Sequence, residues 1–218
     1  ILTAFGSSQT YIFTPNAGYE VDSVIIDGIS VGPITSYTFN NISANHTIQP
    51  TFKLIKFTIA SSAGANGSIL PIGNTIVLVN ANQDFTITPA SGFEIDTVVV
   101  DGISLGAISQ YSFKNIVVNH SINASFKNIK HTILSSADTN GTISPSGSIT
   151  ANQNSSLTFS ITPRVNFLID KVLVDGVEVG SVNSYTISNI SAPHTISASF
   201  KSKQLFISTI VNGNGSTT

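Results

Sequence analysis

The 218-residue sequence contains no cysteine, methionine or tryptophan and has few charged residues. Because cysteine is absent, neither a disulfide nor a thiolate metal site can form. Charged residues account for 9% of the chain and the net charge is −2, so there is no basic field to attract nucleic acid or an anionic membrane. No apolar run approaches the roughly 20 residues of a membrane-spanning helix. We therefore expect neither nucleic-acid binding nor membrane insertion.

The polar residues that are present are mainly serine, threonine and asparagine, and they occur along the whole chain. An uncharged, hydroxyl-rich surface of this kind is more typical of secreted microbial proteins than of cytosolic enzymes. The opening residues, Ile1-Leu-Thr-Ala-Phe-Gly6, lack the charged n-region of a signal peptide, which predicts a mature product or an excerpt of a longer chain. The expected location is extracellular, either secreted or at the cell surface.

One motif recurs three times: an apolar run, the pair Asp-Gly, and a second apolar run. A clear copy is Lys171-Val-Leu-Val-Asp-Gly-Val-Glu-Val-Gly180, and the Asp-Gly pairs begin at Asp27, Asp101 and Asp175. Both intervals are 74 residues (101 − 27 and 175 − 101). Asp-Gly between two apolar runs predicts a β-hairpin whose two turn residues have positive φ. A fixed period predicts a repeat architecture, here with three units.

Other segments of each unit alternate apolar and polar residues. Examples are Phe85-Thr-Ile-Thr-Pro89 and the segment that closes a unit, His120-Ser-Ile-Asn-Ala-Ser-Phe126. This period of two is typical of half-buried strands, and no segment shows a 3.6-residue period over helical length. Pro71-Ile-Gly-Asn74 is expected to form a loop. The sequence therefore predicts an all-β protein made of tandem small antiparallel β-sandwich-like repeats of 74 residues, with six or seven strands each.

Laying the repeat along the chain divides it into four parts. Residues 1–56 form a unit without its first strand, residues 57–130 and 131–203 form complete units, and residues 204–218 match the opening strand of a further unit. One interpretation is an excerpt of a longer array.

The other interpretation is strand exchange between subunits. The C-terminal strand of one subunit would complete the open first unit of the next by head-to-tail β-strand addition. In this alignment Phe206 takes the position of Phe57, and Asn214 that of Asn66. The residues expected to form the join are Ile1, Leu2, Ala4, Leu205, Phe206, Ile207, Ile210 and Val211.

Histidines and aspartates recur once per unit and are the candidates for chemistry. They are His46, His120 and His194, with the turn residues Asp27, Asp101 and Asp175. Zinc needs three or four converging ligands, and no second ligand lies at a suitable spacing, so each histidine is expected to open a strand and to hydrogen-bond locally. Calcium prefers six to eight oxygens. Each turn aspartate is therefore expected to shape its turn, with weak cation binding as the alternative. We predict no metal and no cofactor.

Catalytic motifs such as Gly-x-Ser-x-Gly or a phosphate-binding loop are absent from the sequence. The carboxylates that are present recur with the repeat, whereas a catalytic site is normally unique. We therefore predict that the protein is not an enzyme.

One stretch of the sequence resembles the divergent internalin B-type repeats of bacterial proteins. It runs from Gly92 to Gly102 and is followed by Tyr111-Ser-Phe113 and by Asn119-His-Ser-Ile-Asn-Ala-Ser-Phe126. The resemblance covers the whole chain. It implies a stalk or spacer module of a large secreted or surface-attached protein, with a structural or adhesive role and no catalytic residues.

The expected function is that of a non-catalytic extracellular structural repeat protein. It would be either a filament subunit joined head-to-tail to copies of itself by strand complementation, or a stalk or spacer segment of a surface adhesin. The alternative is a carbohydrate-binding or adhesive β-module that recognises surface glycans. Sugars stack on exposed aromatic side chains, but tryptophan is absent and most phenylalanines and tyrosines occupy strand positions expected to face inward.

Overall fold

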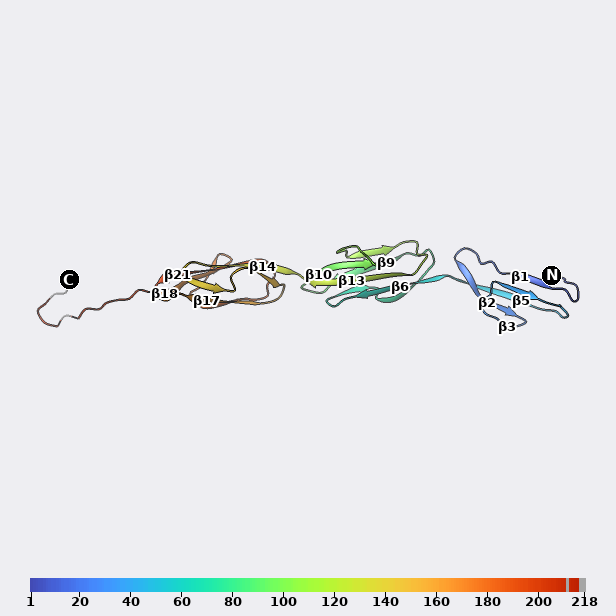
Figure 1. The fold of residues 1–218 in the computed structure, drawn as a ribbon, viewed down its shortest axis with the longest axis horizontal. Coiled ribbons are helices and arrows are strands. Elements are labelled where there is room, and N and C mark those ends of the chain that lie inside the picture. Colours follow the sequence, from blue (N-terminus) through green and yellow to red (C-terminus); the bar gives the residue numbers. More distant parts are fainter. Residues whose placement is uncertain (211, 216–218) are drawn as a thin grey trace. The chain divides into compact units, whose positions relative to one another are not determined.

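The computed structural model describes residues 1–210 and 212–215, which form twenty-one β-strands and no helix (Figure 1). This confirms the all-β class. The described part of the chain therefore holds no helix long and apolar enough to cross a membrane. The chain forms two compact units, one of residues 1–90 with 95–127, and one of residues 91–94 with those from 128 onward.

The first strand set comprises β1 to β5 and lies in the first unit. Its strands are β1 (Gln9–Ile12), β2 (Tyr19–Ile26), β3 (Ile29–Ser30), β4 (Ser36–Phe39) and β5 (Ile48–Leu54). They form a three-stranded sheet, β3-β2-β5, and the two-stranded sheet β1-β4. The core between them contains Phe13, Val24 and Phe39.

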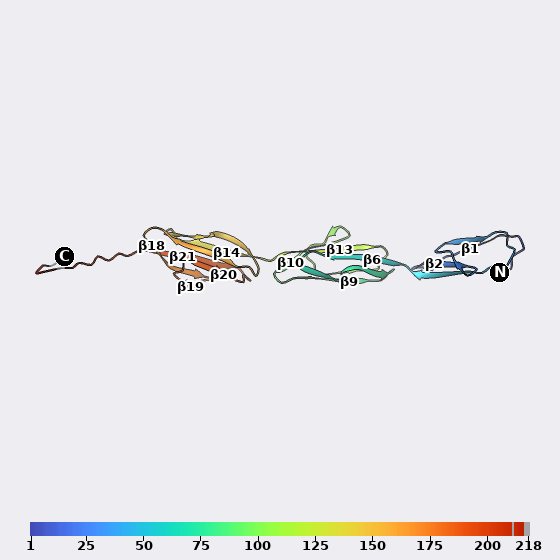
Figure 2. The same ribbon diagram turned by 90° about the horizontal axis from the view of Figure 1, so that it is seen from below.

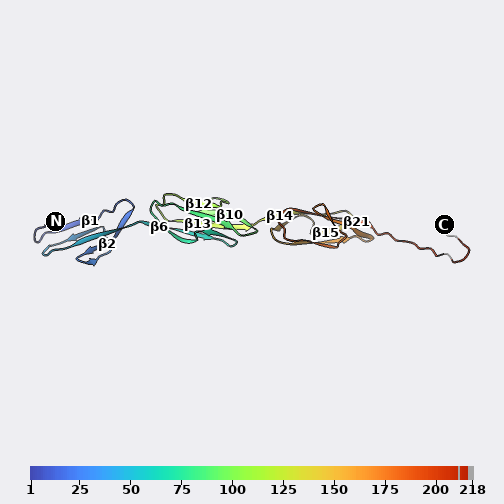
Figure 3. The ribbon, with the colours of Figure 1, turned by 180° about the vertical axis from the view of Figure 1, so that it is seen from behind.

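The second strand set comprises β6 to β13. Its strands are β6 (Lys56–Ala63), β7 (Gly67–Leu70), β8 (Gly73–Leu78), β9 (Gln83–Pro89), β10 (Phe93–Val100), β11 (Ile103–Ser104), β12 (Gln110–Phe113) and β13 (His120–Asn128). A five-stranded sheet, β11-β10-β13-β6-β8, and a three-stranded sheet, β12-β9-β7, enclose one core. Figure 3 labels β6, β10 and β13 of the first sheet and β12 of the second.

The third strand set comprises β14 to β21 and lies in the second unit. Its strands are β14 (Lys130–Ala137), β15 (Gly141–Ser144), β16 (Gly147–Asn152), β17 (Leu157–Pro163), β18 (Phe167–Val174), β19 (Val177–Gly180), β20 (Ser184–Ile187) and β21 (His194–Ser202). The sheets are β16-β14-β21-β18-β19 and β15-β17-β20, and Figure 2 shows β14, β18 and β21 together. Strands β2, β10 and β18 begin 74 residues apart, at 19, 93 and 167.

Strand burial follows the predicted period of two. In β9, Phe85 and Ile87 are buried while the threonines beside them are exposed. The same alternation recurs in β17 at Phe159 and Ile161. Apolar side chains on one face of each strand therefore build the core, which is the largest stabilising contribution in a small β-domain.

The predicted hairpin turns are confirmed in all three strand sets. Asp27 and Gly28 both have positive φ, 50° and 83°, and Ile26 pairs directly with Ile29 across the turn. Glycine accepts this conformation freely and aspartate tolerates it, whereas most side chains would clash. The pairs that begin at Asp101 and Asp175 have the same signs of φ.

The sheets differ from the prediction in two respects. First, the second and third strand sets have eight strands each, because Gly73–Leu78 forms an edge strand directly after the loop residues Pro71 and Ile72. Second, one pair in each five-stranded sheet is parallel: β13 pairs with β6, and β21 with β14. The last strand of each of these sets lies beside the first and runs in the same direction.

Candidate functional sites

Each strand set contains a hydrogen-bonded pair of one histidine and one aspartate, which we call the His–Asp clasp. In the first set His46 Nδ1 lies 2.7 Å from Asp27 Oδ2. The same atoms are 2.7 Å apart in the pair His120 and Asp101, and in the pair of His194 with Asp175. Because an ionised carboxylate only accepts hydrogen bonds, Nδ1 of each histidine carries the donated hydrogen.

The clasp connects two segments that are distant in sequence. Asp27 is the first residue of the hairpin turn between β2 and β3, and His46 immediately precedes the residues that lead into β5. The other carboxylate oxygen, Asp27 Oδ1, accepts the backbone N–H of Thr47 at 2.7 Å. One side chain therefore fixes the turn to the residues at the start of β5, and Asp175 does the same with Thr195 of β21 at 2.8 Å.

In the first two strand sets an aromatic ring packs against the histidine, whereas the third set has Ile187 at the equivalent position. The ring of His46 stacks on Phe39 with centroids 4.7 Å apart, and His120 lies 4.6 Å from Phe113. Phe39 and Phe113 are themselves buried core residues. The histidine thus connects the core to the hairpin turn.

The hydrogen bonds of the clasp alter the acidity of the aspartates. The hydrogen bond from His46 and that from the backbone of Thr47 hold the pKa of Asp27 below its ordinary value. His194 and Thr195 lower the pKa of Asp175 in the same way. For Asp101, burial acts to raise the pKa, but the hydrogen bonds outweigh it and the pKa is lowered. All three aspartates are therefore held in the ionised form.

These contacts show what the recurring residues do. Both carboxylate oxygens of Asp27 are engaged within the protein, and the described residues contain no group of three or more histidine, cysteine, aspartate or glutamate side chains arranged to hold a metal ion. The expectation that each histidine opens a strand is confirmed for His120 and His194, where β13 and β21 begin, but is wrong for His46, because β5 begins at Ile48. The pairing with aspartate was not predicted, although the constant separation of 19 residues between the two positions could have suggested it.

Lysine–aspartate ion pairs recur at the other end of the same strands. Lys53 Nζ lies 3.2 Å from Asp22, and Lys201 Nζ lies 3.2 Å from Asp170. Asp22 in β2 and Asp170 in β18 each lie at a β-bulge, where the residue has no counterpart directly opposite it on the paired strand. A bulge turns a side chain away from its regular direction. The hydrogen bond with Asp22 raises the pKa of Lys53. These exposed pairs are structural and each contributes little stability.

The free edge of β5 distinguishes the first strand set from the other two. Strand β13 lies between β10 and β6, and β21 lies between β18 and β14, whereas β5 pairs only with β2 among the described residues. The core beside β5 is correspondingly less covered. Ile48 is partly exposed, but its counterparts 74 and 148 residues later, Ile122 and Ile196, are each 1% exposed.

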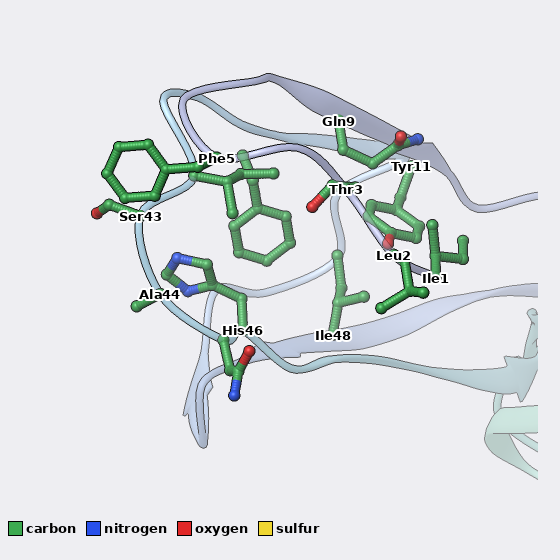
Figure 4. Close-up of a pocket in the computed structure, with 13 residues that line it drawn as sticks. Ile1, Leu2, Thr3, Phe5, Gln9, Tyr11, Ser43, Ala44, His46 and Ile48 are labelled. Atoms are coloured by element: carbon green, nitrogen blue, oxygen red, sulfur yellow. The ribbon is translucent and has the colours of Figure 1, made fainter.

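A cavity of about 430 Å³ opens beside this edge, and its lining residues include Phe39. His46, Ile48 and Tyr11 also line it (Figure 4). Leu2 also borders the cavity but is itself fully exposed, so it does not cover the core. The lining combines apolar side chains such as Ile48 and Phe39 with polar ones such as Gln9, Ser43 and Asn45, so the cavity does not by itself select an apolar occupant over a polar one.

The structure places the residues predicted to join subunits as follows. Ile1 and Leu2 line the cavity beside β5, and Ala4 is exposed close by in sequence. Residues 204–210 belong to no strand, and the side chains of Leu205, Phe206, Ile207 and Ile210 are more than four-fifths exposed. Val211 lies outside the described residues.

No family profile and no curated protein matches the chain. Among solved structures, the chain is similar to the open conformation of the pilus adhesin SpaC from Lactobacillus rhamnosus GG, with 8% identity over 92% of this chain and a TM-score of 0.28. The aligned part spans 44% of that adhesin.

Two further solved structures show weaker similarity. One is the I9–I11 tandem of titin, with 10% identity, a TM-score of 0.15 and coverage of 89% of this chain and 93% of that one. The other is the central fibronectin-III array of RIM-binding protein, with 10% identity, a TM-score of 0.17 and coverage of 85% and 82%. All three are β-domain proteins, but at these TM-scores the likeness carries no argument about function.

Proposed function

We propose that this chain is a non-catalytic structural protein of the cell exterior, whose tandem β-strand sets form a stalk or spacer and join copies of the chain by strand addition. The recurrence of its polar groups supports a structural role. The His–Asp clasp occurs three times with the same 2.7 Å contact. Groups that repeat with the fold maintain the fold, whereas a catalytic constellation needs to occur only once.

The observation that carries this proposal is the parallel pairing of the first and last strands in the second and third sets. Residues 59–63 of β6 pair with residues 120–124 of β13, and residues 133–137 of β14 pair with residues 194–198 of β21. The chain enters each set through the first strand and leaves through the last. Tension on the chain therefore slides two parallel neighbours past each other.

This geometry resists force. In a sheared pair of strands, all of the connecting hydrogen bonds carry the load together, whereas a hairpin that is peeled open breaks its bonds one at a time. A spacer that must transmit tension benefits from the first arrangement. The rate of forced unfolding depends on the unfolding barrier rather than on the equilibrium stability, so the relevant test applies force directly.

Single-molecule force spectroscopy on the whole chain tests the proposal. We expect two high-force steps, one for each of the second and third strand sets, and each step should release roughly 25 nm, since about 70 residues extend to about 3.6 Å each. The first strand set is an internal control, because β5 has no parallel neighbour among the described residues. If all three sets extend at the same low force, the spacer role is wrong.

A further inference from the structure

We infer that the free edge of β5 binds residues 205–210 of a second copy of this chain as a parallel strand. This deepens, and rests on, the structural role proposed above. The same kind of interface already exists twice in the molecule, where β6 lies against β13 and β14 lies against β21. The added strand would give the first strand set the parallel interface that the second and third sets already have.

The register of the added strand follows from the Asn-Gly pairs. They begin at Asn66, Asn140 and Asn214, which are 74 residues apart. Counting back from Asn214 places Ile207 at the position of Ile59 and Ile133, both of which are 0% exposed in their cores.

This register, which aligns Ile207 with Ile59, differs by one residue from the alignment of Phe206 with Phe57 given in the sequence analysis. A slip of one residue turns every side chain of a strand to its opposite face. Leu205, Ile207 and Thr209 then face the core of the partner, while Phe206 and Ile210 face outward.

The contacts of the added strand can be read from β6. In the second set Ile59 lies opposite His120, and Ser61 lies opposite Ile122. Moving both pairs by the repeat places Ile207 opposite His46, and Thr209 opposite Ile48. His46 and Ile48 are the β5-side residues that line the cavity beside the free edge, so the added strand would cover the exposed part of this core.

A glycine and a phenylalanine fit together at the same interface. A Cβ on Gly67 would lie 2.3 Å from the ring of Phe126, and one on Gly141 would lie 2.2 Å from Phe200, so both positions require glycine. Their counterparts in the proposed interface are Gly215 and Phe52. Phe52 is 42% exposed, whereas Phe200 is 7% exposed, so the ring of Phe52 is available to cover Gly215.

Pro50 limits the strength of the interface. Its counterpart Ala124 directs its backbone toward β6, since its carbonyl accepts the N–H of Gly64 at 2.9 Å. Proline has no N–H to donate, so the added strand loses one ladder hydrogen bond at this position. The association should therefore be reversible and concentration-dependent. Because donor and acceptor surfaces differ, it should grow head-to-tail beyond the dimer.

Sedimentation velocity on the 218-residue chain across a range of concentrations tests this inference with two matched pairs of variants. Ile207→Ser removes the inward-facing side chain, and Ile210→Ser makes the same change on the outward face. Both side chains are more than four-fifths exposed in the isolated chain. Gly215→Val introduces a clash with Phe52, whereas Ser208→Val adds the same side chain at an outward-facing position where the other units have the exposed residues Ala60 and Leu134.

We expect Ile207→Ser and Gly215→Val to weaken self-association at least tenfold, and both controls to associate like the unaltered chain. Phe52→Ala should restore association to Gly215→Val, because it makes room for the valine. The inference is overturned if the unaltered chain stays monomeric at every concentration. It is also overturned if the two isoleucine variants behave alike, which would indicate association through another surface. Neither result would affect the force experiment, which tests single chains.

Discussion

Gly67 occupies a position at which a side chain cannot be accommodated. A Cβ there would lie 2.3–2.4 Å from three ring atoms of Phe126. We expect Gly67→Ala to destabilise the second strand set by about 1–3 kcal/mol, the usual cost of overpacking. Gly64→Ala is the matched control, because its Cβ would lie 3.6 Å from the nearest atom, an ordinary contact. Urea denaturation followed by circular dichroism measures both; equal stabilities for the two variants would contradict the steric argument.

The clasp aspartates make a pH-dependent contribution to stability, and Asp175 is a suitable test. The hydrogen bonds from His194 and Thr195 lower its pKa in the folded state below the ordinary value of 3.8. Stability from this group is therefore fully present above about pH 4, and is lost as the pH falls through the lowered pKa.

We expect Asp175→Asn to reduce the free energy of unfolding at pH 7 by less than about 1 kcal/mol, because the pair is exposed to solvent. The difference from the unaltered chain should shrink toward zero as the pH is lowered below 4. Thermal melts between pH 7 and pH 2 measure it. Asp84→Asn, which removes an exposed carboxylate from β9, is the control, and a difference for Asp175→Asn that persists unchanged at pH 2 would show that the carboxylate's charge is not involved.

The Asp-Gly turn was predictable from the sequence, but the contact between its aspartate and a histidine was not. The Asp-Gly turn follows from local conformational preference, since Asp27 and Gly28 need positive φ and tolerate it. The contact between Asp27 and His46 depends on where β5 begins relative to the hairpin turn, which no local pattern reveals. A separation of 19 residues that recurs in three units was the available signal.

At the scale of elements, the edge strands β8 and β16 occupy equivalent places but have different surfaces. On β8 the side chains of Ile76 and Leu78 are 67% and 42% exposed. The equivalent residues of β16 are Thr150 and Asn152. An apolar edge strand without charge or proline is prone to pair with other strands, so β8 should be the more adhesive of the two edges.

Exchanging these residues tests that difference. We expect the double variant Ile76→Thr and Leu78→Asn to keep its stability within about 0.5 kcal/mol, as is usual for surface substitutions, and to aggregate less at high concentration. The reciprocal change, Thr150→Ile with Asn152→Leu, should increase aggregation. Static light scattering against protein concentration measures both, and scattering that is unaltered in both variants would show that neither edge is adhesive.

Strand faces were predictable from the sequence, but strand neighbours were not. The period of two identifies Phe85 and Ile87 as inward-facing, because alternation along one strand is a local property. The parallel pairing of β6 with β13 joins residues about 60 positions apart, and alternation is equally compatible with several strand orders. Strand β8 was missed because it begins with Gly73 and Asn74, which are typical of turns.

At the scale of the whole molecule, the three strand sets have separate cores of unequal completeness. The second and third cores each combine two sheets, with Ile59 and Phe85 in one and Ile133 and Phe159 in the other fully enclosed. The first core has fewer buried residues and a cavity beside Ile48. Local opening requires less free energy where fewer apolar contacts must be broken, so the first strand set should open most readily.

Hydrogen exchange of the dilute, monomeric chain measures this order. Residues two apart in a strand direct their backbone groups to the same side, so the amides of Ile122 and Ala124 both face β6, as the bond from Gly64 to Ala124 shows. The amide of Ile48 faces the free edge of β5 instead.

We expect the amide of Ile48 to exchange at least tenfold faster than that of Ile122, which corresponds to a difference of about 1.4 kcal/mol in the free energy of opening. The amide of Ile196, which should face β14 in the same way, provides an independent comparison in the third set. Equal protection of the three amides in a confirmed monomer would mean that the free edge of β5 is covered by the chain itself.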